Sequence, residues 1–218
     1  MLTLFEELYL LALDDDHGNI LPYVKKTYSY GLAGAVLAEL VFQNRIKLGE
    51  KHRLILKNTE LTGDEVLDEA IHELHASDKA HKPSYWISQF NLKPKKQREQ
   101  LGVRLAGKGY LHQEDKRFFW IFNEGEEDHP MAPQKYELKS VLRAKILSTE
   151  AKDARNLALL KIIAASGLLE LVFTRDELPL AARAINEQMI RAALENPALQ
   201  TIEEIGQGVA TCLEDELD

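Results

Sequence analysis

The opening segment, residues 2–13, constrains the fold more than any other part of the sequence. Thr3 is followed three residues later by Glu6, the pattern of a capping box, which satisfies the free amides of a helix N-terminus. Over the next two turns only Glu6 and Glu7 are strongly polar, and almost all the other residues are apolar. A helix that is apolar around nearly its whole circumference must be buried. We therefore expect a mostly buried helix here.

A second helix is expected after an acidic turn. Residues 14–19 favour a turn, residues 20–23 are short and apolar, and Gly31 leads into an apolar stretch that ends at Phe42. Gly31 and Gly34 lie on one side of the first turn of this predicted helix. Because these glycines lack side chains, another backbone or a ligand can approach closely there.

The pattern of the remaining chain is mostly helical. Further capping-box sequences, each a Thr with a Glu three residues later, mark possible helix starts at Thr62, Thr174 and Thr201. Long amphipathic stretches lie near residues 136–147, 152–170 and 178–195. The longest apolar stretch, residues 156–173, is interrupted by Lys161 and Glu170, so it lacks the roughly 20 apolar residues that a membrane span needs. We interpret it as a central buried helix.

Strands are few and short by the same analysis. Two hairpins are expected, one pairing residues 45–48 with 53–57 and the other pairing residues 110–113 with 117–123. The glycines before the second hairpin, Gly102, Gly107 and Gly109, are interpreted as helix-end and turn residues.

Composition is typical of one ordinary globular domain. The 218 residues are 45% hydrophobic, with only 12 Gly and 7 Pro. We predict a mainly α fold, a single-domain helical bundle with small β-hairpins that spans residues 1–218. The single cysteine, Cys212, cannot form an internal disulfide, which is typical of a reducing compartment. With no signal peptide or anchor in the sequence, we expect a cytoplasmic protein whose membrane contact is peripheral.

Charge is distributed unevenly along the chain. The net charge is -8, yet residues 93–117 hold eight Lys and Arg against three Asp and Glu, so this window carries +5 and the remainder -13. An anionic partner would be attracted to the window and repelled elsewhere. Pro94 favours a helix start, and Lys95 and Arg98 at spacing i, i+3 lie on one side of that helix. A phosphorylated headgroup could be held between them.

A series of short motifs occurs in a characteristic order along the chain. The motifs are Leu2-Thr3-Leu4 with Glu6-Glu7, Gly31-Leu32-x-Gly34, Arg45-Ile46-x-Leu48, Thr62-Gly63-Asp64, Trp86-Ile87, Arg98-Glu99-x-Leu101, Lys108-Gly109-x-Leu111 and His129-Pro130. No single motif is diagnostic. The ordered set resembles the Golgi phosphoprotein 3 family over residues 2 to about 195.

This resemblance implies a peripheral membrane adaptor that binds an anionic phospholipid. In the family, basic residues at the helix positions of Lys95 and Arg98 bind the phosphate of phosphatidylinositol 4-phosphate. A family arginine that points toward the lipid is replaced here by Ala33, so one bidentate phosphate donor is missing. A neighbouring family tryptophan falls at Pro22 or Tyr23. The resemblance therefore implies a headgroup-binding set of Lys95, Arg98 and Tyr23.

Attachment through these residues would be weak. Basic residues near an anionic surface contribute about 1 kcal/mol each, so stable binding requires oligomerisation or a partner. Lys25 or Lys26 would lend charge, and the apolar loop at residues 20–23 would contact the interface. By resemblance, the protein partners are cytosolic tails of membrane proteins such as glycosyltransferases.

Two departures from the family pattern bear on assembly and origin. Eukaryotic members carry a basic, flexible extension before the Leu-Thr-Leu motif, and its absence here indicates a prokaryotic-type member. The acidic residues 124–128 fall where the family has a hairpin tip and subunit contacts. The possibility of a homo-oligomer is therefore left open.

Two alternatives belong to other functional classes. A helix, a basic helix and a hairpin follow one another in the order of a winged helix, in which Lys95, Lys96, Arg98 and Arg104 would contact nucleic-acid phosphates. The acidic remainder of the chain makes nucleic acid the less expected partner. The second alternative is a protein-interaction scaffold without a lipid ligand.

Catalysis and metal binding have little support. His72 and His75 are spaced one residue short of the His-Glu-x-x-His zinc motif, so we interpret them as an exposed helix face. Cys212 lies near acidic residues, which disfavour a reactive thiolate, and no nucleophile elbow, Walker loop or dinucleotide fingerprint occurs. We expect no catalytic residue, no metal site and no cofactor.

Overall fold

The computed structural model describes the chain except for residues 16–18, 92–93, 115–116, 122–131, 148–152 and 218, and except for the side chains at 91–98, 147 and 217. The helices in the described ranges are α1 (Leu4–Ala12), α2 (Lys25–Phe42), α3 (Glu65–Ala76), α4 (Pro83–Asn91), α5 (Pro94–Gly107), α6 (Pro133–Leu147), α7 (Ala154–Ala165), α8 (Leu178–Glu195) and α9 (Pro197–Leu217). Short 3₁₀ turns are η1 (Pro22–Val24), η2 (Glu50–His52) and η3 (Leu169–Leu171). Two antiparallel hairpins are formed by β1 (Ile46–Leu48) with β2 (Leu54–Leu56), and by β3 (Leu111–Glu114) with β4 (Arg117–Trp120). The predicted mainly α fold with small β-hairpins is confirmed.

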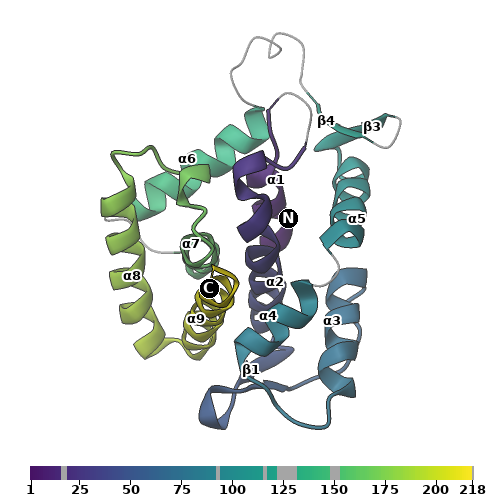
Figure 1. The fold of residues 1–218 in the computed structure, drawn as a ribbon, viewed down its shortest axis with the longest axis vertical. Helices are drawn as coiled ribbons and strands as arrows, with labels where there is room; N and C mark the ends of the chain where they lie inside the picture. Colours follow the sequence, from purple (N-terminus) through teal and green to yellow (C-terminus); the bar gives the residue numbers. More distant parts are fainter. Residues whose placement is uncertain (16–18, 92–93, 115–116, 122–131, 148–152, 218) are drawn as a thin grey trace.

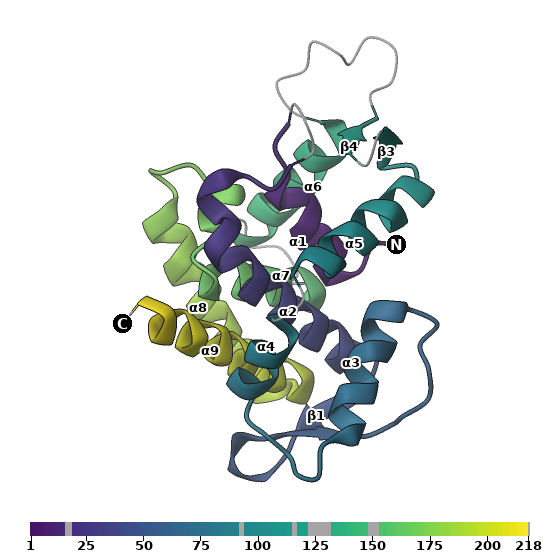
Figure 2. The same cartoon turned by 45° about the vertical axis from the view of Figure 1, so that its right-hand side comes forward.

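Helices α1 and α2 lie at the centre of the molecule (Figure 1). Helices α6 to α9 cover one side of this pair, whereas α3 and α5 lie on the other side. Helix α4 packs against both α2 and α9. The two hairpins lie at opposite ends of the molecule (Figure 2). The chain therefore wraps around its own first helix.

Helix α1 begins with the predicted capping box. The Thr3 hydroxyl oxygen accepts the Glu6 N–H at 3.3 Å, and the Glu6 carboxylate accepts the Thr3 N–H at 2.7 Å. From Leu4 to Leu13, every residue except Glu7 is at most 1% exposed. The prediction of a mostly buried opening helix is confirmed.

Buried charges meet at the N-terminus of α1. The ammonium of Lys108, the residue directly after α5, donates to both Glu6 oxygens, at 2.6 and 2.8 Å. The Glu39 carboxylate of α2 accepts the Leu4 N–H at 2.9 Å and pairs with the Arg155 guanidinium of α7 at 2.9 Å. A helix N-terminus favours nearby carboxylates, and the two cations balance the charge that these carboxylates bring into the core. Helices α1, α2, α5 and α7 are thereby joined at one point.

A second ion pair fastens α5 to α3. The Arg104 guanidinium donates to both Asp64 oxygens, at 2.6 and 2.9 Å, which is a bidentate geometry. Asp64 also caps α3, because one of its oxygens accepts the N–H groups of Val66 and Leu67 at 3.0 and 3.2 Å. One carboxylate therefore starts α3 and holds α5.

The other three predicted helix starts differ from those in the structure. The start at Thr62 is wrong, because the capping carboxylate belongs to Asp64 and the Thr62 hydroxyl donates elsewhere. The start at Thr201 is also wrong, because α9 begins a turn earlier and the Asn196 side chain accepts the first free N–H group there, that of Ala198, at 3.0 Å. At Thr174 the expected carboxylate does accept the backbone N–H, at 2.9 Å, yet α8 begins only at Leu178. Asp and Asn compete with Thr as caps, and proline favours the first helical turn.

The two glycines of α2 allow close helix packing. A Cβ atom at Gly31 would lie 2.5 Å from the Ser166 hydroxyl oxygen, and one at Gly34 would lie 2.7 Å from a Val209 methyl carbon. The close approach is made by side chains, so the expectation that another backbone or a ligand would come near these glycines is wrong. The predicted start of the helix at Gly31 is wrong, because α2 begins six residues earlier, at Lys25.

The predicted continuous helix over residues 156–173 is interrupted. Helix α7 ends at Ala165, and Gly167 adopts a left-handed conformation with φ of 67°. That conformation reverses the chain direction at a helix end and is open to glycine at little cost. The residues after this turn still bury apolar side chains, including Leu171 and Phe173, so the stretch contributes to the core as predicted.

Both predicted hairpins are confirmed in their pairing. Ile46 pairs with Leu56 in the first hairpin, and Leu111 pairs with Trp120 in the second. Gly107 is the last residue of α5, and Gly109 adopts a left-handed conformation with φ of 78°. Their interpretation as helix-end and turn residues is confirmed. Gly102 was misinterpreted, because it lies inside α5 beneath the Phe118 ring of β4.

Glu7 makes the stability of the protein depend on pH. Burial raises the pKa of the Glu7 carboxyl from 4.5 to about 7. The positive charge of Arg155 lowers this pKa and the negative charge of Glu39 raises it further, but both effects are smaller than that of burial. The Oε2 atom of Glu7 has no hydrogen-bond partner among the described residues. Stability should therefore fall as pH rises from 4.5 to 7, by up to about 3 kcal/mol, because the folded protein holds a proton that the unfolded chain releases. We expect Glu7→Gln to be more stable than the native chain at pH 8 and equally stable at pH 4.5. Urea unfolding at both pH values measures this, and parallel pH profiles for the two proteins would show the idea to be wrong.

Gly102 should be intolerant of a side chain. A Cβ atom there would lie 2.3 to 2.6 Å from atoms of the Phe118 ring, whereas one at Gly107 would have no neighbour within 4 Å. We expect Gly102→Ala to lower the free energy of unfolding by about 2 kcal/mol through overpacking. Gly107→Ala is the matched control and should be neutral or stabilising by up to about 1 kcal/mol. Chemical denaturation compares the two, and equal values would contradict the packing role of Gly102.

Candidate anion-binding site

Helix α5 carries the basic residues that the sequence singles out. It begins at Pro94, as predicted, and places the backbone of Lys95 and Arg98 in its first two turns. The side chains of these two residues lie outside the described part of the structure. The headgroup contact between them stays a prediction.

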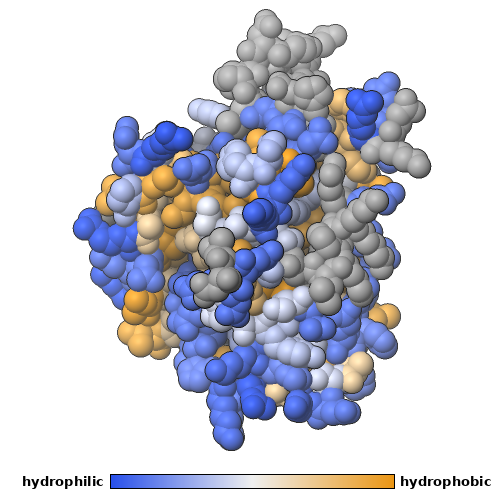
Figure 3. All heavy atoms as spheres, viewed as in Figure 1, coloured by the Kyte–Doolittle hydropathy of each residue, from blue (hydrophilic) through white to orange (hydrophobic). Residues whose placement is uncertain are grey.

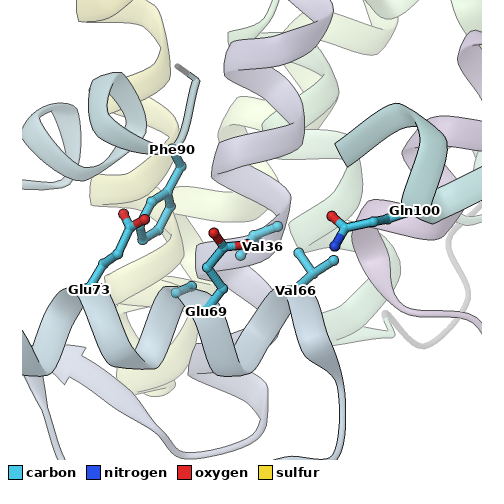
Figure 4. A pocket seen from close by; sticks show the side chains of 7 residues that line it. Val36, Val66, Glu69, Glu73, Phe90 and Gln100 are labelled. Atoms are coloured by element: carbon cyan, nitrogen blue, oxygen red, sulfur yellow. The ribbon is translucent and has the colours of Figure 1, made fainter. Parts of the chain in front are cut away.

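A small acidic hollow lies on the inner side of α5. Its lining includes Val36 of α2, Glu69 and Glu73 of α3, Phe90 of α4 and Gln100 of α5 (Figure 4). The cavity volume is about 20 Å³, enough for roughly one water molecule. A phosphorylated headgroup is too large for this hollow.

The cations in the second half of α5 and just after it are engaged inside the protein. Arg104, which would contact phosphates in the winged-helix alternative, is held by Asp64, and its guanidinium also lies 5.7 Å from the centre of the Phe5 ring. Lys108 is held by Glu6. The expectation that Arg104 is available to nucleic acid is therefore wrong. Of the other cations in the basic window, Arg117 is exposed, and the side chains of the rest lie outside the described part of the structure.

Tyr23 lies on the surface in a different setting. It belongs to η1, and its side chain is 62% exposed. Burial of part of the ring, followed by the charges of Glu170 and Asp15, raises the pKa of its phenol. Lys25 and Lys26 are exposed in the first turn of α2. An exposed aromatic ring with a polar tip suits a membrane interface, although the carboxylates nearby do not attract an anion.

The predicted interfacial loop reaches the surface only in part, because Pro22 is exposed and Leu21 is half-buried, whereas Ile20 is buried. Ile20 is 4% exposed and forms an isolated β-bridge with Leu13, so the expectation that the whole apolar loop contacts the interface is wrong. Ala33, at the position of the family arginine, is 1% exposed within α2. It offers no donor to a ligand.

Exposed apolar side chains occur on several helices, including Val103 of α5, which is 51% exposed. On the face shown in Figure 3, apolar residues gather over α6 and α8, on the side of the molecule opposite α5 in Figure 1. Leu180, Ile190 and Leu194 of α8 are 50%, 52% and 82% exposed.

One set of basic residues escaped the sequence analysis. Lys135, Lys139 and Arg143 recur every fourth residue along α6, so they share one face of that helix. Their spacing could have identified the row. Their partners could not be read from it, because these lie in distant segments.

Side chains with potential chemistry are inert in this structure. The Cys212 thiol is 6% exposed and lies 3.3 Å from the Ser84 carbonyl oxygen, and burial raises its pKa, so the unreactive thiol is favoured. His72 and His75 are exposed on α3, as predicted. Among the described residues, no group of three or more His, Cys, Asp or Glu side chains could hold a metal ion. None of the helices in the described ranges combines the length and apolar character that a membrane span requires.

The chain is similar to known proteins over most of its length. Residues 4–205 match the family model described as Golgi phosphoprotein 3 (GPP34). The vacuolar protein sorting-associated proteins 74 of Schizosaccharomyces pombe and of Eremothecium gossypii are each 30% identical to it over 166 residues, which is 67% of this chain and 48% of the relative. The chain thus spans about half the length of these curated relatives. Because the match covers nearly the whole chain, the resemblance inferred from the ordered motifs is confirmed, and the chain belongs to the Golgi phosphoprotein 3 family.

Proposed function

We propose that this protein is a peripheral membrane adaptor that captures an anionic phospholipid headgroup through Lys95 and Arg98. By family resemblance, the headgroup is phosphatidylinositol 4-phosphate. The protein acts without catalysis or a cofactor, from the cytoplasmic side of the membrane. Tyr23 contributes an interfacial contact.

One observation carries this proposal, namely the concentration of positive charge near the start of α5 in an otherwise acidic chain. The window from residue 93 to 117 carries +5 within a chain of net charge -8. Two of its eight cations, Arg104 and Lys108, are neutralised by Asp64 and Glu6. Lys95 and Arg98 belong to the first two turns of α5, the position at which the family resemblance implies headgroup binding.

The arrangement supports weak attachment by a single chain. Each basic residue near an anionic surface contributes about 1 kcal/mol, and Ala33 supplies no further donor. A second copy of the chain, or the cytosolic tail of a membrane protein, would raise the apparent affinity by adding binding sites on the same surface. We therefore propose that the adaptor works together with such a partner.

Nucleic acid is the weaker alternative partner. The element order of a winged helix is present, because α5 is followed by the hairpin of β3 and β4. Arg104 is nevertheless engaged by Asp64, and the rest of the chain is acidic. A scaffold that binds protein without lipid remains the second alternative, and the experiment below separates the three.

Sedimentation with liposomes tests the proposal. The native chain should bind vesicles that contain phosphatidylinositol 4-phosphate more strongly than vesicles with phosphatidylserine or neutral lipid alone. We expect Lys95→Ala/Arg98→Ala to reduce this binding about tenfold or more, since two charged contacts are lost. Lys47→Ala/Lys79→Ala removes the same charge at two exposed positions outside α5, and it should bind like the native chain.

Three results would count against the proposal. Equal binding to both anionic lipids would indicate a general charge effect without headgroup recognition. Equal losses in the two double variants would show that α5 has no special role. An absence of binding to every vesicle, combined with salt-sensitive binding to any DNA duplex, would favour the winged-helix alternative, and an absence of both would favour the scaffold.

A further inference from the structure

The row of cations on α6 contains a lysine whose charge has no partner in the part of the chain that the structure describes. Lys135, Lys139 and Arg143 occupy positions i, i+4 and i+8 of this helix. Residues four apart are neighbours on a helix surface, so the three positive charges stand side by side. Such a row is costly unless anions balance it.

Both ends of the row are balanced. Lys135 is only 2% exposed, and its ammonium donates to the Leu13 carbonyl oxygen at 2.6 Å and to the Asp15 carboxylate at 2.9 Å. Arg143 at the other end donates to the Glu177 carboxylate. These anions come from the segment after α1 and from the turn before α8, so α6 is clamped at two points.

Lys139, in the middle of the row, has no such anion. Within the described ranges, no carboxylate lies within ion-pair distance of its ammonium, and no hydrogen bond satisfies it. Its side chain is partly buried. Burial and the charges of Lys135 and Arg143 hold the pKa of Lys139 below its usual value, and Asp15 opposes them only in part. Among the described residues, three cations of this row face two carboxylates, which leaves one positive charge at Lys139.

We propose that Lys139 is an anion-binding site that takes a phosphate group, separate from the proposed site at Lys95 and Arg98. A primary ammonium offers three hydrogen-bond donors, and a phosphate presents several oxygen acceptors to them. The neighbouring carboxylates are already paired with Lys135 and Arg143, so they do not compete for Lys139. A bound phosphate restores charge balance along the row.

The surroundings are compatible with a phosphate on a lipid as well as a free one. Lys139 is only partly buried, so its ammonium is accessible from the surface of the protein. A phosphate on a lipid headgroup and a free phosphate present the same oxygen acceptors to it. The experiment therefore includes both sources of phosphate.

Thermal unfolding in inorganic phosphate provides the first test. The native chain should gain about 3 °C in Tm at a phosphate concentration about ten times Kd, compared with chloride at equal ionic strength. Lys139→Met should unfold at a higher temperature than the native chain in chloride, because an unpaired buried charge is removed, and it should lose the response to phosphate. Lys139→Gln serves as a second variant if the methionine variant does not fold.

Lys145→Met is the matched control, since it removes the same charge from the same helix at a position outside the row. It should keep the full response to phosphate, and so should Lys95→Ala/Arg98→Ala. A native chain that does not respond, or a Lys139→Met variant that responds like the native chain, would overturn the proposal. The second result would identify general salt stabilisation as the cause.

Vesicles separate the two sources of phosphate. Phosphatidic acid vesicles should retain the native chain and lose Lys139→Met, with glycerol 3-phosphate competing in solution, if the phosphate is that of a lipid. Stabilisation by inorganic phosphate without vesicle binding would support the site with a soluble phosphate as its ligand. Vesicle binding that Lys139→Met retains in full would count against Lys139 as a lipid contact.

Discussion

The charge balance at the buried N-terminus of α1 is the interaction on which the rest of the structure depends. Glu6 is fully buried, so its negative charge must be met by a cation, and Lys108, directly after α5, supplies it. Glu39 of α2 accepts an amide of α1 and requires Arg155 of α7 in turn. An unpaired buried carboxylate would cost several kcal/mol. Four helices must therefore dock together before any of them is fully stable.

This internal demand for charge decides which cations can serve a ligand. The second half of α5 is fixed by Arg104 on Asp64, and Lys108 beyond its end is fixed on Glu6, whereas Lys95 and Arg98 lie near its start. On α6, Lys135 and Arg143 are paired with carboxylates, and only Lys139 between them has no anion among the described residues. The number of positive charges counted in the sequence therefore overstates the number that is available to bind a membrane or a nucleic acid. The structure reduces the count to particular positions.

Local patterns predicted most of the fold. The capping box at Thr3, the burial of α1 and the pairing of both hairpins depend on residues close together in the chain, and each is confirmed. The errors arose where a neighbouring residue competed for the same role, as Asp64 did with Thr62. Gly102 was misread because the ring that requires it belongs to a strand beyond the turn. The side chains of Lys95 and Arg98 lie outside the described structure, so that part of the site rests on sequence and family membership.

The sequence by itself determined the helical class, the buried first helix, the family and the uneven distribution of charge. These properties follow from spacing and composition, which act over a few residues. Only the tertiary structure decided which charges are neutralised, because Glu6 and Lys108 are 102 positions apart, and Asp64 and Arg104 are 40 apart. Coulomb interactions depend on distance in space and on burial, and no local pattern contains either quantity.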